Sequence, residues 1–541
     1  MNAPEILATQ LGGPQLVRDY QAGASALAPF YAGSPFDLAA YRRQMDLVGR
    51  CFPEASRRAM YDAITPTSEA ARAKLEAIAA GDGFFVSTGQ QAGLFGGPLY
   101  TIYKTLSTIR LAAALEEKLG VTVAPLFWVA ADDHDFAEVN HTYVIGGDNI
   151  LHRIEIDGAS EKTFSMNLHP LDASVGTAIG RLRSILPNDE ISGEVLRWIE
   201  DAYVPGFSVA AAFKQLIESM FARFDLLVTS SADPVVKSLA APVILRELEQ
   251  SEQTEVAVGD QTDRLVAAGY HGQVTVRPGA VNVLYEDDEG RDRLMRDGDG
   301  WRLARTKRRF EKSELRDLLM LQPERFSPNV HLRPVVASAV FPTLAYVGGP
   351  AEISYFGQIG GLFAAHNVPM PLVAPRASMD IVEYKVQKVL DKFSLKVSDV
   401  QVPFNQLVSQ VMRDELPADV TKTINGLRDR ITQSYDHLVS ATHSIDPTLK
   451  GPLENTRNMS LKSLLDIDKK IVSHSKKKNE VGVDQLRKAS ASLFPEGVRQ
   501  ERSVNAVSYL TRYGAEFLDT LANRINIDLS KSAPDWSGVK C

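Results

Sequence analysis

Polar side chains follow short apolar runs at several places in this sequence, and the first such place combines glycines with amides. Behind the run 83–87 stand Gln90, Gln91, Gly96 and Gly97. Glycines let a ligand approach the backbone, and a helix that begins at Pro98 directs free N–H groups and its positive dipole end at an anion. A tight turn that serves only packing is the alternative. We predict a ligand-binding loop, because adjacent amides have little purpose in such a turn.

The second place is acidic and carries histidine. His134, Asp135 and Asn140 follow the apolar run 121–130. Carboxylates beside an imidazole can orient it and hold its charged form, which general acid–base chemistry requires. His134, Asp135 and His141 could instead bind a metal, and a purely structural loop is a third interpretation. We favour catalysis by His134 and Asp135 with substrate binding by Asn140, and we predict no tightly bound metal.

The third place contains Asn329 and Arg333, and it leads into Glu352 and Tyr355 behind a second Gly-Gly-Pro sequence. Glu352 lies in the first turn of a predicted helix, where an acid can simply complement the helix dipole. It can also receive a substrate amine or hydroxyl. We favour this second role, because the Gly-Gly-Pro sequence opens a helix behind a strand twice in one chain. Asn329, Arg333 and Tyr355 are predicted to bind substrate.

The fourth place is Arg376 with Ser378, directly behind the apolar run 371–373. A guanidinium group can bind carboxylate or phosphate through two parallel hydrogen bonds. Alternatively, Arg376 connects the preceding region to the helical sequence that follows. We predict substrate binding for both residues.

These places share one position relative to the predicted secondary structure. A strand at 83–87, a helix at 98–119 and a strand at 121–130 form a βαβ unit, and its crossover should be right-handed. Further strands are predicted at 226–230, 343–347 and 371–373, with helices between them, including one at 350–366. This alternation predicts an α/β fold with a doubly wound parallel sheet. Because ligands bind outside the carboxyl ends of such strands, we predict that one cleft contains Gln90, His134, Glu352 and Arg376.

Two stretches interrupt the alternation and are interpreted as inserted subdomains. The first contains strand-like runs at 151–156 and 163–168, and the second contains a strand-like run at 281–286 before a turn at 297–300. The predicted organisation lists a core of 1–147, 206–274 and 331–378, inserts of 148–205 and 275–330, and a helical coiled-coil domain with a C-terminal segment at 379–541.

The helical region contains a heptad pattern. Apolar or small residues recur at spacings of three and four from Ile424 to Ile445, and Pro447 ends this run. A second helical run covers 453–474. Two such helices joined by a Pro/Gly turn predict an antiparallel coiled-coil arm. Its seam needs a partner surface, which is either the core or a second copy of the chain, and we favour a homodimer.

Composition excludes several classes of protein. The net charge of −8 argues against a general nucleic-acid partner, which usually requires a basic surface. No apolar run approaches the roughly 18 residues that a membrane-spanning helix needs, so no membrane partner is expected. The first basic residue is Arg18, which is not typical of a signal peptide. Two cysteines cannot form a disulfide framework. A cytoplasmic protein is expected.

Long segments around these residues resemble the bacillithiol-biosynthesis family BshC, the cysteine ligases. The similar segments are 88–104, 124–141, 332–358, 371–383 and 499–519. The resemblance implies a Rossmann-type core with two inserts and a coiled-coil domain that dimerises. Gly96, where the family commonly has Thr, and Ala131-Asp132, in place of a more usual Gly-Glu, depart from the family pattern.

The resemblance also implies an activity, the last step of bacillithiol formation. In this step the carboxyl group of cysteine is joined to the amine of glucosaminyl malate, with activation of the carboxylate by ATP, which gives AMP or ADP, and with Mg²⁺. A nucleotide site beside the helical domain would involve Arg502, Asn505 and Tyr513, and Gly96 and Gly97 of the glycine loop are further candidates for nucleotide binding. The alternatives are a nucleotidyltransferase-like enzyme that acts on another small acid and a non-catalytic scaffold assembled through the coiled coil.

Overall fold

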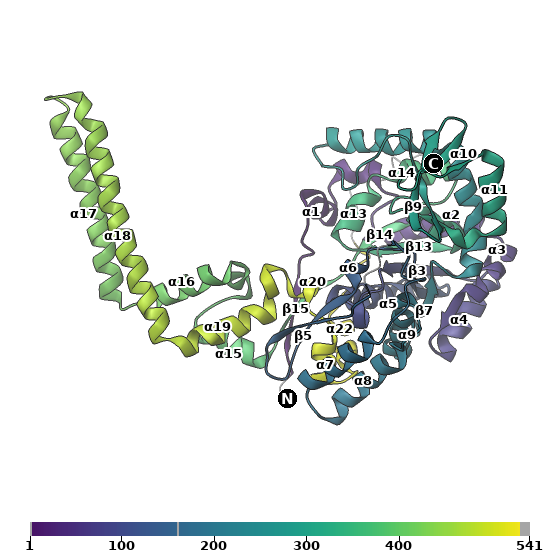
Figure 1. The fold of residues 1–541 in the computed structure, drawn as a ribbon, viewed down its shortest axis with the longest axis horizontal. Coiled ribbons are helices and arrows are strands. Elements are labelled where there is room, and N and C mark those ends of the chain that lie inside the picture. Colours follow the sequence, from purple (N-terminus) through teal and green to yellow (C-terminus); the bar gives the residue numbers. More distant parts are fainter. Residues whose placement is uncertain (1–2, 159–161, 531–541) are drawn as a thin grey trace.

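The computed structural model describes residues 3–158 and 162–530. Within these residues, six strands form the core sheet in the spatial order β14-β13-β3-β4-β7-β2 (Figure 1). Their bounds are Leu372–Pro375 (β14), Thr343–Gly348 (β13), Phe84–Gln90 (β3), Val123–Val129 (β4), Leu227–Ser230 (β7) and Ile64–Pro66 (β2). The strands β14, β13, β3, β4 and β7 are parallel, and only β2 at the edge runs antiparallel. The predicted doubly wound α/β core is confirmed.

The order of the parallel strands reverses once. The chain moves outward from β3 to β4 and β7, then returns to place β13 on the opposite side of β3, followed by β14. The point of reversal lies between β3 and β13. In doubly wound sheets this switch point leaves a crevice at the carboxyl edge, where ligands bind.

Helices cover both faces of the sheet. One face packs against α2 (Leu38–Cys51), α5 (Leu99–Leu119) and α9 (Val209–Met220), and the other against α4 (Glu69–Ala79), α10 (Pro234–Ala267) and α12 (Arg333–Val340). Leu126 and Trp128 of β4 face one layer, and Phe127 and Val129 face the other. All seven residues of β4 are buried, as its uninterrupted apolar sequence predicts.

The helix predicted at 350–366 is wrong as a single element. It is two short helices, α13 (Pro350–Phe356) and α14 (Gly360–His366), separated at Gly357–Ile359. The buried side chain of Gln358 accepts hydrogen bonds from Gln273 N and Val274 N at 2.7 and 2.9 Å, which ties the break to a neighbouring segment. Close packing also requires a glycine here, because a Cβ at Gly361 would lie 2.9 Å from Ala257 O on α10.

The first insert begins with a hairpin of β5 (His141–Ile145) and β6 (Leu151–Glu155), and the boundary predicted at 147/148 falls in its turn. The helices α7 (Ser174–Ile185) and α8 (Glu190–Ala202) follow. The predicted strand at 163–168 is wrong. Only an isolated bridge joins Thr163 to Gly290, and a turn closed by Leu168 N–H and Ser165 O comes next.

The second insert is a small antiparallel sheet with the order β11-β10-β9-β8-β12. Its strands are Ala280–Asp287 (β8), Gly290–Asp297 (β9), Gly300–Leu303 (β10), Arg309–Phe310 (β11) and Phe326–Pro328 (β12), and α11 (Lys312–Leu321) precedes β12. The predicted strand at 281–286 and the turn at 297–300 are both confirmed.

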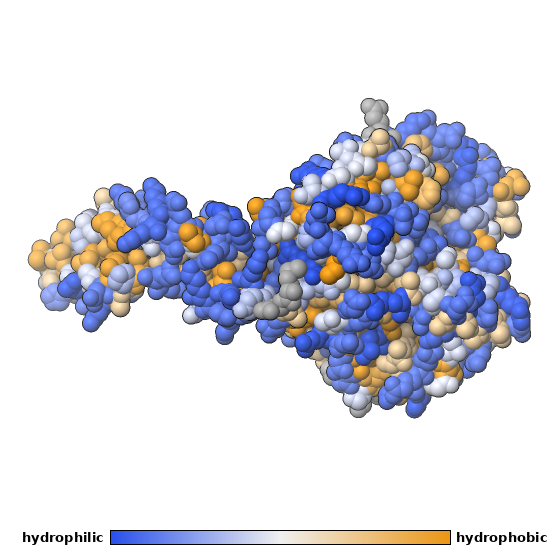
Figure 2. Space-filling model, turned by 90° about the horizontal axis from the view of Figure 1, so that it is seen from below, coloured by the Kyte–Doolittle hydropathy of each residue, from blue (hydrophilic) through white to orange (hydrophobic). Residues whose placement is uncertain are grey.

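The predicted antiparallel coiled-coil arm is also confirmed. The helices α17 (Ala418–Thr442) and α18 (Lys450–Lys478) form a hairpin that extends away from the core (Figure 1). Its base contains α15 (Tyr384–Lys392), α16 (Phe404–Asp414) and α19 (Glu480–Leu493). Several apolar side chains of the arm are exposed, and they appear as orange patches toward its free end in Figure 2.

Both ends of the described chain connect the arm to the core. Near the N-terminus, β1 (Glu5–Thr9) pairs with β15 (Ser378–Val382), the strand that leads into the arm. After the arm the chain returns through α20 (Gln500–Ser503), α21 (Val507–Tyr513) and α22 (Phe517–Asn523). These last helices pack against α5 and α8 and share the core of the first insert. The segment 500–528 is therefore part of the core structure rather than of the arm.

Candidate functional site

The carboxyl ends of the parallel strands open into a pocket of about 720 Å³. Each of these strands supplies a lining residue at its end or just beyond it, namely Gln90, Asp132, Ser231, Gly349 and Arg376. The opposite wall comes from the second insert. The pocket therefore lies where an open α/β sheet binds its ligand.

Most of the residues predicted from the sequence line this pocket. They are Gln90, Gln91, His134, Asn329, Arg333, Glu352, Tyr355, Arg376 and Arg502. Four of them, Gln90, His134, Glu352 and Arg376, were expected to converge from distant parts of the chain, and the structure brings them together.

Asp135 and Asn140 do not line the pocket. The Asp135 carboxylate accepts the Glu138 backbone N–H at 3.2 Å and caps the short helix α6 (Phe136–Val139). The Asn140 side-chain oxygen lies 3.1 Å from His141 Nδ1. In this structure the Asp135 carboxylate makes no hydrogen bond to His134, so the geometry gives no support to the expectation that Asp135 orients His134.

The glycine loop is a packing turn, which corrects the predicted ligand-binding role of Gly96 and Gly97. The first N–H of α5, at Leu99, donates to Val504 O at 2.8 Å, so the C-terminal segment covers the N-terminus of this helix. Gly96 packs against α9, where an added Cβ would meet Leu216 at 3.6 Å. Neither glycine lines the pocket. The first N–H of the helix at Pro98 is therefore not available to an anion.

Asn505 and Tyr513 have structural roles as well. Asn505 is fully buried, and its amide donates to Phe95 O at 2.9 Å and to Thr142 Oγ1 at 3.1 Å. The Tyr513 hydroxyl donates to Glu383 Oε1 at 3.0 Å. These bonds attach the C-terminal segment to the loop before α5, to β5 and to Glu383, which directly follows β15. Of the residues that the resemblance implied for a nucleotide, only Arg502 lines the pocket.

A buried ion pair stands at the switch point. Lys104, in the second turn of α5, places Nζ 2.8 Å from Glu352 Oε2 on α13, and their side chains are 3% and 16% exposed. Burial lowers the pKa of Lys104. Burial by itself would raise the pKa of Glu352, but the lysine charge and the hydrogen bonds to the carboxylate together outweigh it and hold this pKa below its usual range. Tyr346 and the Gly349 N–H also donate to the Glu352 carboxylate. Its oxygens are therefore engaged, and Glu352 is not free to receive a substrate amine as we expected.

The imidazole of His134 has a defined tautomer. Arg291 Nη1 lies 3.0 Å from His134 Nδ1. A guanidinium group only donates, so Nδ1 is the acceptor and the neutral ring carries its proton on Nε2. Burial and then the Arg291 charge lower the pKa of His134, which favours this neutral form. His134 is therefore a hydrogen-bond donor through Nε2.

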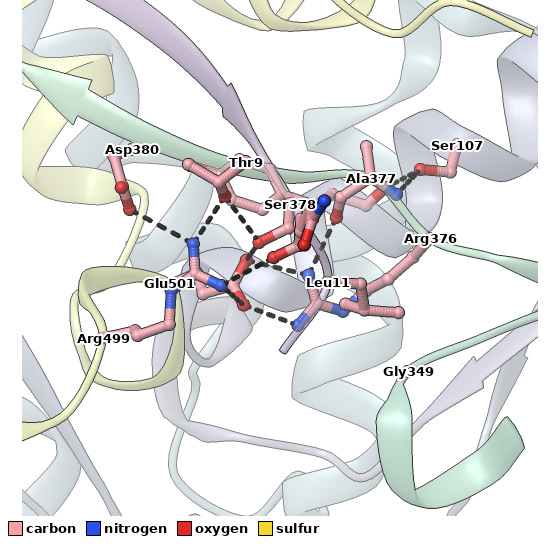
Figure 3. A network of polar contacts seen from close by, with 12 residues as sticks. Thr9, Leu11, Ser107, Gly349, Arg376, Ala377, Ser378, Asp380, Arg499 and Glu501 are labelled. Atoms are coloured by element: carbon pink, nitrogen blue, oxygen red, sulfur yellow. Dashed lines mark hydrogen bonds and ion pairs between the residues drawn. The ribbon is translucent and has the colours of Figure 1, made fainter. Parts of the chain in front are cut away.

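Arg376 belongs to a network of polar contacts that includes Ser378 and Glu501 (Figure 3). Its two Nη atoms donate to the Glu501 carboxylate at 2.9 and 3.0 Å, and Ser378 donates to the same carboxylate at 2.8 Å. Both charged side chains are 3% exposed. Arg376 thus connects the core to the C-terminal segment, as the alternative interpretation of this residue stated. Because Glu501 already accepts two parallel hydrogen bonds from Arg376, the guanidinium cannot form the same pair of bonds with a substrate carboxylate or phosphate.

The two amides predicted at the end of β3 are positioned differently. Gln90 donates to the Tyr100 hydroxyl at 3.2 Å and accepts from Lys104 at 3.3 Å. Gln91 donates to the Asp133 carboxylate at 2.6 Å and to the Glu138 carboxylate at 2.9 Å. Gln90 thus belongs to the group around Lys104, whereas Gln91 belongs to the loop that carries His134.

Cationic side chains outnumber acidic ones among the described residues of the pocket. Lys104, Arg277, Arg291, Arg293, Arg333, Arg376 and Arg502 face Asp132, Asp133, Glu255 and Glu352. The acids are also engaged elsewhere, since Asp132 lies 2.7 Å from Lys237 and Glu255 pairs with Arg296. The chain as a whole carries −8, so the pocket is a positive region in a negative protein. Such a field favours anionic ligands.

The metal alternative at His134, Asp135 and His141 finds no support in the geometry. In the described part of the chain, no group of three or more His, Cys, Asp or Glu side chains is placed to hold a metal ion. The described residues likewise contain no helix long and apolar enough to cross a membrane.

Sequence reasoning missed Lys104, Arg291, Arg293 and Tyr346, all of which line the pocket. A signal existed for Lys104, which is the single charged residue in the first half of a largely buried helix, where a partner acid would be expected. Arg291 and Arg293 alternate on β9, so both point to one face of the insert sheet. Nothing in the local pattern shows that this face meets the core.

Another pocket residue, His331, leads to a prediction about stability and pH. Burial, assisted by the Arg293 charge, lowers the pKa of His331 to about 4. In the unfolded chain a histidine titrates near pH 6.5. As the pH falls from about 6.5 to about 4, the unfolded chain binds a proton that the folded chain does not, so this histidine lowers the free energy of unfolding by about 3 kcal/mol.

Urea denaturation at several pH values measures this loss. The His331→Gln variant should lose less stability across the window than the parent protein, by about the same 3 kcal/mol. The exposed His271 is the matched control, and His271→Gln should leave the pH dependence unchanged. Parallel curves for the parent and His331→Gln would refute the assignment.

Comparison with known proteins places this architecture. A family model described as "Bacillithiol biosynthesis BshC, N-terminal Rossmann-like domain" matches residues 1–377, and one described as "Bacillithiol biosynthesis BshC, C-terminal coiled-coil domain" matches residues 379–528. A Salinibacter ruber protein named "Putative cysteine ligase BshC" is 33% identical, with 96% of this chain and 95% of the relative covered. Proteins of the same name from Chlorobaculum tepidum and Koribacter versatilis are 32% and 28% identical and cover 81% and 97% of this chain.

The fold and the site define a Rossmann-type α/β enzyme of the ligase class, with an anion-attracting pocket at the switch point and a coiled-coil arm. More particularly, the chain belongs to the BshC family of bacillithiol biosynthesis, because the two family models together match nearly its whole length.

Proposed function

We propose that this protein ligates L-cysteine to glucosaminyl malate in the cytoplasm, with MgATP as the source of activation, and so forms bacillithiol. The observation that carries the proposal is the excess of cationic groups in the switch-point pocket. All three substrates are carboxylates or phosphates, and a positive pocket in a negative protein suits them.

The chemistry requires two steps. Cysteine's carboxylate oxygen attacks a phosphorus atom of ATP and gives an acyl-adenylate with pyrophosphate, or an acyl-phosphate with ADP. The neutral amine of glucosaminyl malate then attacks the acyl carbon, the bond to AMP or phosphate breaks, and the amine loses a proton. Both transition states place negative charge on oxygen, which fixed cations and N–H groups stabilise.

Residues of the pocket match these needs. His134 offers an Nε2–H donor, and Arg291 keeps that tautomer in place. Arg333 lies beside Tyr355 and Tyr346. Burial opposes its charge, but the two hydroxyls and Glu352 outweigh burial and raise the pKa of Arg333, which remains a cation at any working pH. We assign developing negative charge to His134 and Arg333, and the nucleotide phosphates to the side of the pocket that carries Arg502.

Lys104 and Glu352 maintain the geometry of this site. The pair joins the start of α5 to the N-terminus of α13, and Gln90 and Tyr346 complete it. Glu352 thus acts through its neighbours and does not touch substrate. Mg²⁺ would enter with the nucleotide, because magnesium in such sites is commonly held by substrate phosphates and few protein carboxylates.

The test is direct. The full-length protein is incubated with cysteine, glucosaminyl malate and MgATP, and bacillithiol is sought by mass spectrometry, with omission of each substrate as a control. The nucleotide product, AMP or ADP, identifies the mode of activation. Absence of turnover under all these conditions would refute the proposal. ATP–pyrophosphate exchange that is triggered by another small acid, and not by cysteine, would favour the nucleotidyltransferase alternative.

We also propose that the arm forms a homodimer. Among the described residues of α17 and α18, exposed apolar side chains include Leu427, Leu438, Met459, Leu465 and Ile467. Fully burying one such side chain contributes about 1.5–3 kcal/mol, so several together can drive association. Sedimentation at micromolar concentration should show a dimer, and Leu427→Glu with Leu438→Glu should convert it to a monomer.

The exposure of these positions makes the dimer test specific. Leu427 and Leu438 are 39% and 43% exposed in the single chain, so glutamate there should not unfold the arm. Gln433→Glu, at an exposed polar position of the same helix, is the matched control and should remain dimeric. A strict monomer for the parent protein would contradict the proposal.

A further inference from the structure

The pocket wall that comes from the second insert carries cationic charge without acidic partners. Arg293 of β9 and Arg277, in the segment before β8, both line the pocket. In the described part of the chain, neither guanidinium has a salt bridge or a hydrogen bond to another side chain. This contrasts with Lys104, which pairs with Glu352, and with Arg376, which pairs with Glu501.

The two guanidinium groups lie close enough to influence each other. Burial and then the Arg277 charge lower the pKa of Arg293, and the Asp292 charge offsets them only in part. His331 completes the group. It is 5% exposed, it lines the same pocket, and its Nε2 has no hydrogen-bond partner among the described residues. Burial and the Arg293 charge keep this imidazole neutral at physiological pH.

The surrounding acids do not neutralise this wall. The Asp292 carboxylate accepts the backbone N–H groups of Arg293, Arg305 and Thr306. Glu255 pairs with Arg296 and accepts the Gly279 N–H at 3.0 Å. The positive charges of Arg277 and Arg293 therefore both face the cavity, while Asp292 and Glu255 bond to other groups. Such an arrangement is unfavourable by itself, and a bound dianion relieves it.

Local anchors fix the wall in place. Gln358 holds the backbone of Gln273 and Val274, and Ala280 N–H donates to Arg277 O at 3.0 Å. On β9, Arg291 points to the same face as Arg293. The Arg291 guanidinium, however, already donates hydrogen bonds to Ser327, Pro328 O and His134. Arg293 is thus the member of this pair that remains available to a ligand.

We propose that Arg277 and Arg293, together with the neutral His331, form a subsite for the two carboxylates of the malyl group of the acceptor. This inference rests on the proposed function. Charged hydrogen bonds from guanidinium groups suit carboxylates and phosphates alike. The carboxylates are assigned here because the reacting atoms belong with His134 and Arg333 and the nucleotide phosphates with Arg502, whereas the malyl end does not react.

Calorimetric titration of the full-length protein tests the subsite without turnover. The ligands are glucosaminyl malate, methyl glucosaminide, which lacks the carboxylates, and MgATP. Arg293→Gln should raise the Kd for glucosaminyl malate about 10- to 100-fold, the loss expected for one charged hydrogen bond. It should leave the Kd values for methyl glucosaminide and MgATP unchanged. Arg277→Gln, at an exposed rim position, should act in the same direction without affecting folding.

Arg302→Gln is the matched control, because Arg302 lies on β10 of the same sheet and does not line the pocket. Its Kd values should equal those of the parent protein. If Arg293→Gln raises the Kd for MgATP and not for glucosaminyl malate, the wall binds phosphate and the malyl assignment is overturned. An unchanged Kd for glucosaminyl malate in both pocket variants overturns it as well.

The outcome separates the subsite from the proposed function. The protein could bind glucosaminyl malate through its carboxylates and Arg293 and yet make no bacillithiol. That result supports the subsite and refutes the ligase proposal. Bacillithiol formation with an unchanged KM for glucosaminyl malate in Arg293→Gln supports the ligase and overturns the subsite.

Discussion

The Lys104→Met variant should lose about 3–5 kcal/mol of its free energy of unfolding, because removal of one partner from a buried ion pair leaves the other charge uncompensated. Glu352 remains bound by Tyr346 and the Gly349 N–H, but it loses the only lysine that contacts it among the described residues. Urea denaturation monitored by circular dichroism measures the change. Turnover should fall with it, because the pair fixes both strand ends at the switch point.

A second variant separates the charge effect from packing. Glu352→Gln alone should also destabilise the protein, whereas the double variant Lys104→Met with Glu352→Gln should recover part of the loss, since no isolated charge remains. Lys118→Met, at an exposed position near the end of the same helix, should change stability by less than about 0.5 kcal/mol. Additive losses in the double variant would show that the two side chains act independently.

The largest effect on catalysis is expected at His134. His134→Ala should lower kcat about 10²- to 10³-fold, the usual consequence of removing one hydrogen-bond donor to a developing oxyanion. The reason is the Nε2–H group, which Arg291 fixes by occupying Nδ1. Steady-state kinetics with all three substrates measures the change, and unchanged turnover would remove His134 from the mechanism. His437→Ala, at an exposed position on the arm, should have no effect on kcat.

The pH profile distinguishes this role from a purely structural one. Burial and Arg291 lower the pKa of His134, so the neutral ring persists as the pH falls below the ordinary value of about 6.5. Arg291→Gln removes one of these causes, and the pKa of His134 should rise. The acidic limb of the kcat profile should then move to higher pH. A limb that stays in place would show that His134 does not determine it.

The core and much of the site could be predicted because their signals are local. The uninterrupted apolar run of β4 requires burial on both faces, and the polar residues behind β3, β4, β13 and β14 then meet at one edge of the sheet. This reasoning brought Gln90, His134, Glu352 and Arg376 to one pocket. It needed only the period of each run and the rule that ligands bind at carboxyl ends.

What the sequence did not predict depends on contacts between distant residues. The glycine loop has the composition of an anion site, yet Val504 and Asn505, about 400 residues later in the chain, cover it. Glu352 and Arg376 were expected to bind substrate, but Lys104 and Glu501 hold them. The helix expected at 350–366 is interrupted where Gln358 bonds to the backbone of Gln273 and Val274, which follow α10. No local pattern contains the identity of such partners.

The return of the chain after the arm has a consequence for biosynthesis on the ribosome. Glu501 neutralises Arg376, and Val504 caps α5, yet both are translated after the whole arm. Until then the nascent Rossmann-type portion carries a buried arginine without its acid and a helix end without its cap. The order of synthesis therefore places the neutralisation of Arg376 and the capping of α5 after synthesis of the arm, whose exposed apolar side chains are by then already made.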